Sequence, residues 1–362
     1  MISTLRETLR LGLIALIGLA VSPASAQEPF YKGKRLSVLV NFAPGGSTDI
    51  EGRLFARHIA RHLEGVSQVV VQNMDGAGGF NGSAYIGEIA PRDGTMVGFL
   101  GGTAWQYANE PARFRTDVRT YEFIAFQPGT TVYYVRKDVA PGMNDAGDIV
   151  KAQGLIAGGN GVHNARDLLI RLTLDILGVQ HRYVTGYRSG QTARLALQRN
   201  EVNFYAEPAS AYRGAVEAQV IQPGTAIPVY VDPIYNGETL SDSPQVEGLP
   251  IPAFQELYRK LKGAPPSGEK WDNYLSVLAL TSAMGRLVAL PPNAPEAAVT
   301  ALRNATARLN EDRAFAEDSM KALGFVPNYV TGADTNRLAR QTLTVKPETR
   351  AFVADYIKRA NK

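Results

Sequence analysis

Two glycine-rich segments carry the residues whose types and spacing could bind a ligand. The first is Phe42–Asp49 (FAPGGSTD), and the second is residues 76–82 (GAGGFNG). Glycine lets a ligand approach the backbone closely, and the free N–H groups at a helix start favour an anion such as a carboxylate or phosphate. Both segments therefore predict anion binding through backbone amides, with Ser47 as the expected N-cap of the first helix.

Similar segments recur further along the chain, at residues 101–103, 158–164 and 185–190. A single segment of this kind is most simply a tight turn between a strand and a helix. Four or five of them at equivalent strand ends favour a ligand site, because ligands of open α/β sheets lie outside the carboxyl ends of the strands. Two aromatic residues beside these segments, Phe42 and Phe80, are expected to line the cleft.

The sequence offers little for catalysis. It lacks a Gly-x-Ser-x-Gly elbow and a His-Glu-x-x-His motif, and it contains no Cys. The glycines of residues 76–82 do not have the spacing of a dinucleotide fingerprint. His58 and His62 share a helix with three arginines, which predicts a solvated basic face rather than a metal site. No cofactor and no metal are predicted.

His163 is the histidine with two open interpretations. It stands in a glycine-rich segment directly before a predicted helix. It is either a polar residue at the start of that helix or a hydrogen-bond donor to a ligand carboxylate, and the sequence favours neither.

Length and composition place the chain among exported two-domain proteins. Its 362 residues include 35 Gly, and its net charge is +4. The sequence has no run of like charges of the kind that indicates binding to nucleic acid. Residues 1–26 read as a secretory signal peptide, with a basic start, an apolar stretch and the site Ala24-Ser25-Ala26. Export to a bacterial periplasm is the expected localisation.

The elements that must position these segments alternate between strands and helices, a pattern typical of an α/β fold. Strands are expected at residues 36–42, 69–71, 96–100, 154–157, 182–184 and 202–205. Helices are expected after each glycine-rich segment and at residues 295–309, 313–323 and 346–360. Two Pro/Gly-rich stretches, 222–252 and 263–268, are expected to be connections.

The glycine-rich segments Phe42–Asp49 and 76–82 resemble the signature loops of the substrate-binding proteins of tripartite tricarboxylate transporters, the Bug receptors. Pro91–Thr95, Thr185–Tyr187 and residues 251–256 resemble further turns of that family. The resemblance implies a Venus-flytrap fold of the type II periplasmic-binding-protein class, with two α/β domains around a ligand cleft. It implies a first domain of residues 27–125 and 250–362 and a second of residues 126–249.

The resemblance also implies which residues contact the ligand. In the family, the two first-domain loops hold a carboxylate through backbone amides and bridging waters. Carried over to this sequence, the expected ligand-binding residues are Phe42, Gly45, Gly46, Ser47, Thr48, Asp49, Gly78, Gly79, Phe80, Asn81, Thr103, Asn160, His163, Asn164 and Tyr187. The family's second-domain loop is richer in Ser, and residues 257–290 look longer than usual, so the distal ligand contacts are not expected to carry over from the family.

The predicted function is a monomeric receptor for a small organic mono- or dicarboxylate. Its partners would be the membrane subunits of a tripartite transporter or a sensor kinase. The alternatives are an exported α/β enzyme, such as a hydrolase using His163 with Asp167, and an interaction protein whose cleft holds a peptide.

Overall fold

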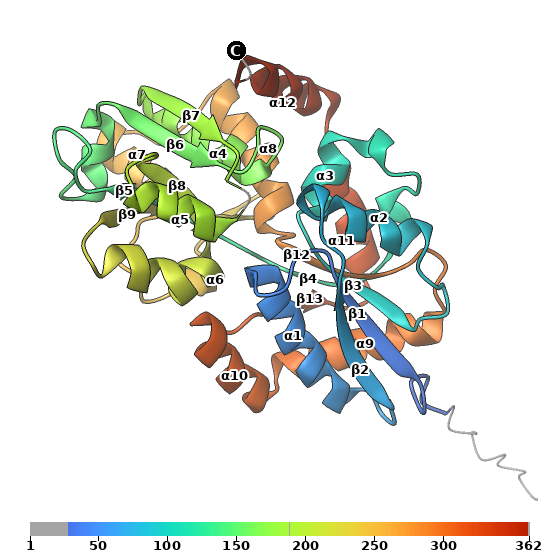
Figure 1. Ribbon diagram of the computed structural model, residues 1–362. Coiled ribbons are helices and arrows are strands. Elements are labelled where there is room, and N and C mark those ends of the chain that lie inside the picture. The colour runs from blue at the N-terminus through green and yellow to red at the C-terminus, as the bar shows by residue number, and fades with distance from the viewer. Residues whose placement is uncertain (1–27, 188, 361–362) are drawn as a thin grey trace, which may run out of the picture.

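The computed structural model describes residues 28–187 and 189–360, so the predicted signal peptide lies outside the described residues. Figure 1 shows two lobes, each built around one β-sheet. Among the described residues, no helix combines the length and apolar composition needed to cross a bilayer.

The first lobe contains a six-stranded sheet. In spatial order its strands are β13 (Val330–Thr331), β4 (Glu122–Gln127), β12 (Arg286–Leu290), β3 (Met96–Gly101), β1 (Arg35–Val40) and β2 (Gln68–Asn73). β1 pairs in parallel with both β2 and β3, whereas β12 is antiparallel to β3 and β4. The carboxyl ends of β1, β2 and β3 therefore meet at one edge of the sheet.

Helices cover both faces of this sheet because its strands alternate apolar side chains between them. Leu36, Val38 and Val40 of β1 point to one face, while Leu39 points to the other. The helices of the first face are α1 (Ser47–Ile59), α9 (Glu296–Asn310) and α10 (Arg313–Leu323); those of the second are α2 (Phe80–Glu88), α3 (Thr103–Asn109) and α11 (Thr335–Leu343).

The second lobe contains a five-stranded sheet. In spatial order its strands are β7 (His181–Thr185), β6 (Leu155–Gly159), β8 (Phe204–Pro208), β5 (Thr131–Arg136) and β9 (Ala226–Val231). β6 is parallel to β7 and β8, so these three carboxyl ends also share an edge. β9 and the small hairpin of β10 (Ile234–Tyr235) and β11 (Leu240–Ser241) lie within residues 222–252, so the prediction that this stretch only connects elements is wrong.

The helices of the second lobe likewise pack on both sheet faces. They are α4 (Ala165–Leu177), α5 (Gly190–Gln198), α6 (Ala209–Ala211) with the π-helix Tyr212–Ile221, and α7 (Phe254–Lys262). Two helices lie where the lobes meet (Figure 1): α8 (Glu269–Ser282) and α12 (Pro347–Ala360) both contact α3. α8 also packs on α4, and α7 packs on β9, so the domain boundary near residue 250 stays a prediction.

Candidate functional site

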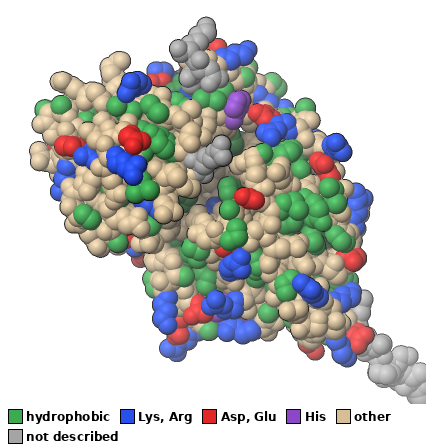
Figure 2. All heavy atoms as spheres, in the orientation of Figure 1, with side chains coloured by type: hydrophobic (Ala, Val, Ile, Leu, Met, Phe, Trp, Pro, Cys, Tyr) green, Lys and Arg blue, Asp and Glu red, His purple; other side chains and the backbone are tan. Residues whose placement is uncertain are grey.

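The carboxyl edges of the two sheets face each other. Ser210, two residues after β8, donates a hydrogen bond of 2.9 Å to the Glu51 carboxylate on α1 of the first lobe. Trp105 Nε1 on α3 donates across the lobes to the carbonyl oxygen of His163 at 2.8 Å. Figure 2 shows the surface hollowed between the lobes. The predicted ligand segments of both lobes therefore border one interlobe region.

The start of α1 presents free backbone donors at this edge. Gly46 is its N-cap, with extended φ and ψ of −78° and 165°, and no side chain caps the helix. The prediction that Ser47 is the N-cap is wrong by one residue, because Ser47 already has helical geometry. Residues 43–46 are exposed. A helix start that no side chain caps, next to an exposed loop, favours an anion at that position.

Asp49, on the first turn of α1, stabilises the loop between β1 and α1 by hydrogen bonding. Its buried carboxylate accepts hydrogen bonds from the Gly45 amide (2.8 Å), Arg53 Nε (2.9 Å) and Asn73 Nδ2 (2.8 Å). Burial by itself would raise the pKa of Asp49, but these hydrogen bonds outweigh it and the pKa is lowered. The carboxylate is therefore ionised and held by three donors of its own lobe, and its contact with a ligand stays a prediction.

The loops after β1, β2 and β3 are joined by Asn41, which the sequence reasoning missed. This fully buried amide donates to the carbonyl oxygens of Gly79 (3.0 Å) and Gly101 (2.9 Å) and accepts from the Gly101 amide (2.9 Å). The signal was present in the sequence as a polar residue at the end of an apolar strand.

The loop between β2 and α2 requires glycine at positions 78 and 79. Gly78 and Gly79 have φ of +67° and +93°, and a Cβ on Gly79 would lie 2.6 Å from Asn41 Nδ2 and 2.9 Å from the Phe42 ring. Gly78 is exposed, and its carbonyl oxygen accepts from Gln106 Nε2 at 2.6 Å. The loop is thus fixed against the β1 loop, with Phe42 half-buried between them.

Phe80 packs against side chains of the first lobe, and its contact with a ligand stays a prediction. Its half-buried ring packs edge-on against Phe114, with centroids 4.8 Å apart, and the Arg113 guanidinium lies 4.2 Å from the ring centroid. The neighbouring Asn81 is exposed and donates to the Asp75 carbonyl oxygen at 3.2 Å. Both side chains therefore contact their own lobe.

Two predicted threonines are buried rather than exposed to a ligand. The Thr103 hydroxyl lies 2.7 Å from Ser83 Oγ, which itself donates to the Gly79 carbonyl oxygen at 2.9 Å. Thr48 is also buried, with its side chain facing Gly101. Both residues contribute to the support of the loops.

The second lobe places its predicted residues in different roles. Asn164 caps α4 by accepting from the Arg166 amide at 3.0 Å. Asn160 Oδ1 accepts from Arg166 Nη2 at 2.5 Å and from the Tyr205 hydroxyl at 3.2 Å. Tyr187 is half-buried, and its amide donates to the Gly159 carbonyl oxygen at 3.2 Å. Only Asn160 among these predicted residues joins a cluster of polar side chains at the sheet edge.

His163 contacts the other lobe. Its imidazole is 61% exposed, and Nδ1 lies 3.3 Å from Glu110 Oε1 of the first lobe. Asp167, its partner in the enzyme alternative, instead accepts from the Gly161 amide (2.7 Å) and the Tyr183 hydroxyl (2.8 Å). The two side chains are therefore not arranged as a catalytic pair.

His58 and His62 each lie within hydrogen-bond distance of an acidic residue. His58 Nε2 lies 3.0 Å from Asp318, and His62 Nε2 lies 2.8 Å from Asp312. His58 is buried, so the prediction of a solvated face is wrong for this residue. Within the described part of the chain, no group of three or more His, Asp or Glu side chains could hold a metal ion.

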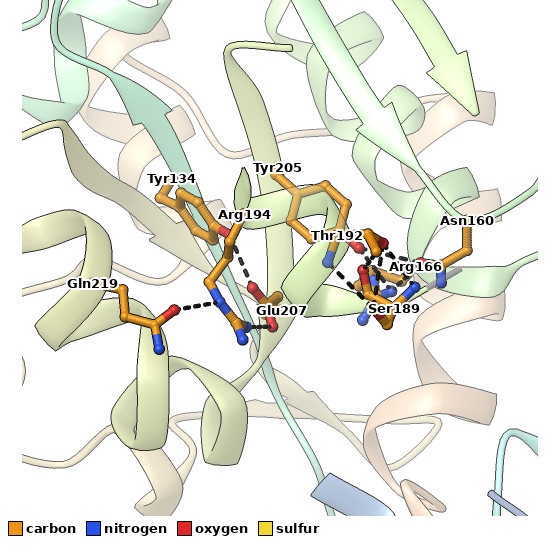
Figure 3. Close-up of polar contacts among 9 residues, drawn as sticks. All are labelled: Tyr134, Asn160, Arg166, Ser189, Thr192, Arg194, Tyr205, Glu207 and Gln219. Atoms are coloured by element: carbon orange, nitrogen blue, oxygen red, sulfur yellow. Dashed lines mark hydrogen bonds and ion pairs between the residues drawn. The ribbon is translucent and has the colours of Figure 1, made fainter. Parts of the chain in front are cut away.

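Figure 3 shows the polar cluster of the second lobe that sequence reasoning did not assemble. Arg194 Nη1 lies 2.6 Å from the buried Glu207 carboxylate, which also accepts from the Tyr134 hydroxyl at 3.0 Å. Beside this ion pair, Arg166 contacts Asn160 and Tyr205. The second lobe thus brings two arginines to its site-facing edge.

The chain was compared with family models, with curated proteins and with solved structures. No family model matches the chain. A stretch of 75 residues is 39% identical to protein BugT of Bordetella pertussis, covering 20% of this chain and 22% of BugT. The chain therefore matches about a fifth of the length of this curated relative.

Solved structures match over nearly the whole chain. Rpa4515 of R. palustris with adipate has a TM-score of 0.64 at 17% identity, covering 91% of this chain and 97% of the other. Periplasmic binding protein BugD has 0.60 at 20% identity, covering 91% and 99%. MatC from Rhodopseudomonas palustris with bound malate has 0.58 at 19% identity, covering 90% and 99%.

These observations establish the fold class: two α/β lobes of the type II periplasmic-binding-protein architecture. The resemblance to the Bug receptors that the loop motifs predicted is confirmed by the match to BugT and by the fold shared with BugD.

Proposed function

We propose that the protein is a periplasmic receptor that binds a small organic carboxylate between its two lobes. The observation that carries the proposal is the start of α1, which no side chain caps and which follows the exposed residues 43–46 at the edge that faces the second lobe. Backbone donors at a helix start provide a fixed site for a carboxylate without requiring a basic side chain. The loop of Gly78 and Gly79 is the proposed second source of amides, directly or through water.

The wider setting is part of the same proposal. Residues 1–26 would be cleaved as a signal peptide, and the mature receptor would act as a monomer without a cofactor. It would deliver its ligand to the membrane subunits of a tripartite tricarboxylate transporter or present it to a sensor kinase. The fold shared with malate-bound MatC and adipate-bound Rpa4515 supports the carboxylate class.

A thermal-shift screen of the mature protein against small carboxylates tests the proposal. A ligand at about 100 times its Kd stabilises the native state by roughly 2.7 kcal/mol, which raises the melting temperature measurably. The same samples are assayed for chemical change of the ligand. A broad panel without any shift would contradict the receptor function, and turnover of a bound acid would favour the enzyme alternative.

A further inference from the structure

A pocket of about 410 Å³ lies on the second lobe, between the end of β9 and the start of α7. Its apolar wall is formed by Val231, Val246, Leu249, Ile251 and Ala253. None of the predicted ligand-binding residues lines it, so the proposed carboxylate site does not account for it. Ligand pockets commonly have volumes of about 300–1,000 Å³, and this one is large enough to enclose an aromatic side chain.

The loop that forms the pocket is fixed by its own hydrogen bonds. The Val231 amide donates to the Pro252 carbonyl oxygen at 3.0 Å, and the Leu249 amide donates to that of Val246 at 3.1 Å. Residues 233–252 also contain four prolines, each of which fixes φ near about −65°. The pocket therefore exists before a partner binds, and little ordering of its backbone opposes binding.

Three carboxylates stand beside this apolar wall. Asp242, Glu247 and Glu256 line the pocket and are exposed, and in the described part of the chain none of them belongs to an ion pair. Arg213 approaches the same loop, but it donates to the backbone carbonyl oxygens of Gln245 (2.8 Å) and Glu247 (2.6 Å). The pocket thus combines an apolar wall with negative charges that are open to solvent.

The sequence around the pocket carries charge of one sign. Residues 214–258 contain six acidic residues and neither Lys nor Arg. Asp232 is buried, and the other five are at least partly exposed. Over the whole chain about one residue in ten is Lys or Arg, and the net charge is +4. An acidic surface confined to one stretch of a basic protein produces a local negative field that attracts cations.

We infer that this pocket is a docking site for a basic segment of a partner protein, which inserts an apolar side chain between lysines or arginines. The apolar wall would remove that side chain from water, and the carboxylates would pair with the flanking cations. The inference goes beyond the proposed function, because it does not depend on which ligand occupies the interlobe site.

The distribution of charge favours a protein segment over a small organic cation. A small cation enclosed in the pocket would meet an apolar wall, where an unpaired charge is costly. The carboxylates are exposed instead, so they suit a partner whose apolar part enters the pocket while its charges stay in solvent. An apolar residue flanked by basic residues has this arrangement.

Three pentapeptides test the inference on the mature protein. The first has phenylalanine between two pairs of arginines, the second has serine in place of the phenylalanine, and the third has phenylalanine between two pairs of glutamates. In calorimetric titration the first should bind about 10-fold or more tightly than the second, because a phenylalanine ring is buried. Its affinity should fall as salt rises from about 20 to about 200 mM, and the third should not bind.

Variants of the pocket separate charge from apolar contact. The double variant Asp242→Asn, Glu247→Gln should weaken the first peptide by about 3- to 10-fold at low salt. Leu249→Ser should bring the affinities of the first two peptides within about 3-fold of each other. Glu238→Gln is the matched control, because Glu238 is exposed in the same acidic stretch but does not line the pocket. It should leave all affinities unchanged.

Each other result overturns the inference. It is wrong if the first peptide does not bind, if the first two bind equally to wild type, or if the double variant binds like wild type. Phenethylammonium binding as tightly as the first peptide would identify a small-cation site instead. Sedimentation of wild type and the double variant completes the test: a dimer that only wild type forms would make a second copy the occupant. If Leu249→Ser does not fold, the double variant and the Glu238→Gln control decide.

Discussion

Ser210 of the second lobe donates a hydrogen bond of 2.9 Å to Glu51 of the first. The Glu51 carboxylate is almost fully buried, and the same oxygen accepts from Arg286 Nη2 at 2.8 Å. Arg286 belongs to β12, so Glu51 is fixed in its own lobe by an ion pair while Ser210 reaches it from the other. The bond can exist only when the two lobes are close, which links it to the population of the closed form.

Replacement of Ser210 by Ala should therefore weaken ligand binding by lowering the population of the closed form, and not by removing a contact with the ligand. The hydrogen bond to a charged acceptor stabilises only the closed form, so its loss should lower affinity by about 3- to 10-fold. Calorimetric titration measures this loss, and small-angle scattering should show a larger mean radius of the unliganded protein. Ser276→Ala, which removes a hydroxyl bonded within α8, is the control; equal affinities for wild type and Ser210→Ala would contradict the prediction.

Gly46→Val should fold normally and fail to bind carboxylates. Gly46 has φ of −78°, and a Cβ there would meet its nearest neighbour, the Ala43 carbonyl oxygen, at an ordinary 3.6 Å. Stability should therefore change by less than about 1 kcal/mol, as expected for an exposed position without strain. The branched side chain would cover the amides at the start of α1, so titration should detect no binding.

Gly46→Ala gives an intermediate control, because a single methyl group covers less of the helix start. Its affinity should lie between those of wild type and Gly46→Val. Wild-type affinity in the valine variant would show that these amides do not hold the ligand.

Asn41→Ala should reduce both stability and binding. Its amide makes hydrogen bonds to the loops after β2 and β3. Truncation removes the side-chain partner of the Gly101 amide and carbonyl groups and one of the two donors to the Gly79 carbonyl oxygen. The free energy of unfolding should fall by about 2–4 kcal/mol. Urea unfolding measures the stability, and titration of the folded variant measures the binding. A loss of stability without any loss of affinity would show that the loop geometry does not depend on Asn41.

Local patterns in the sequence predicted the elements that border the site. The apolar strands at residues 36–42, 69–71 and 96–100 were recognised within two residues of β1, β2 and β3, because strand and turn signals are local. β9 was missed, because the proline and glycine of residues 222–252 outweighed its short apolar run.

The contacts within the site were much less predictable. Nothing near Phe80 in the sequence shows that its ring packs on Phe114, and nothing near Asn41 shows that it reaches Gly101, 60 residues away. Likewise, the contact of Arg166 with Tyr205, 39 residues away, depends on how α4 and β8 are placed relative to one another. Such facts depend on the relative placement of distant segments, which hydrophobic periodicity does not encode.

The last prediction concerns Asp232, a fully buried carboxyl group directly after β9. Its oxygens accept hydrogen bonds of 2.9 Å each from the hydroxyls of Tyr133 on β5 and Tyr274 on α8. Burial raises the pKa of Asp232 from 3.8 to about 7, against the opposing effect of the two tyrosine hydrogen bonds. The folded protein therefore retains a proton that the unfolded chain has already released between these pH values.

Stability should consequently fall as the pH rises from about 4 to about 7, and this contribution should stay constant above that range. The shift corresponds to roughly 4 kcal/mol, since one pKa unit is worth about 1.4 kcal/mol. Asp232→Asn keeps the shape of the side chain but cannot ionise, so it should flatten this part of the pH profile and gain stability relative to wild type at pH 8. Urea unfolding at pH 4.5, 6 and 8 measures the effect, with Asp272→Asn on the exposed side of α8 as the control. If Asp232→Asn and wild type lose stability in parallel over this range, Asp232 is not the group that titrates.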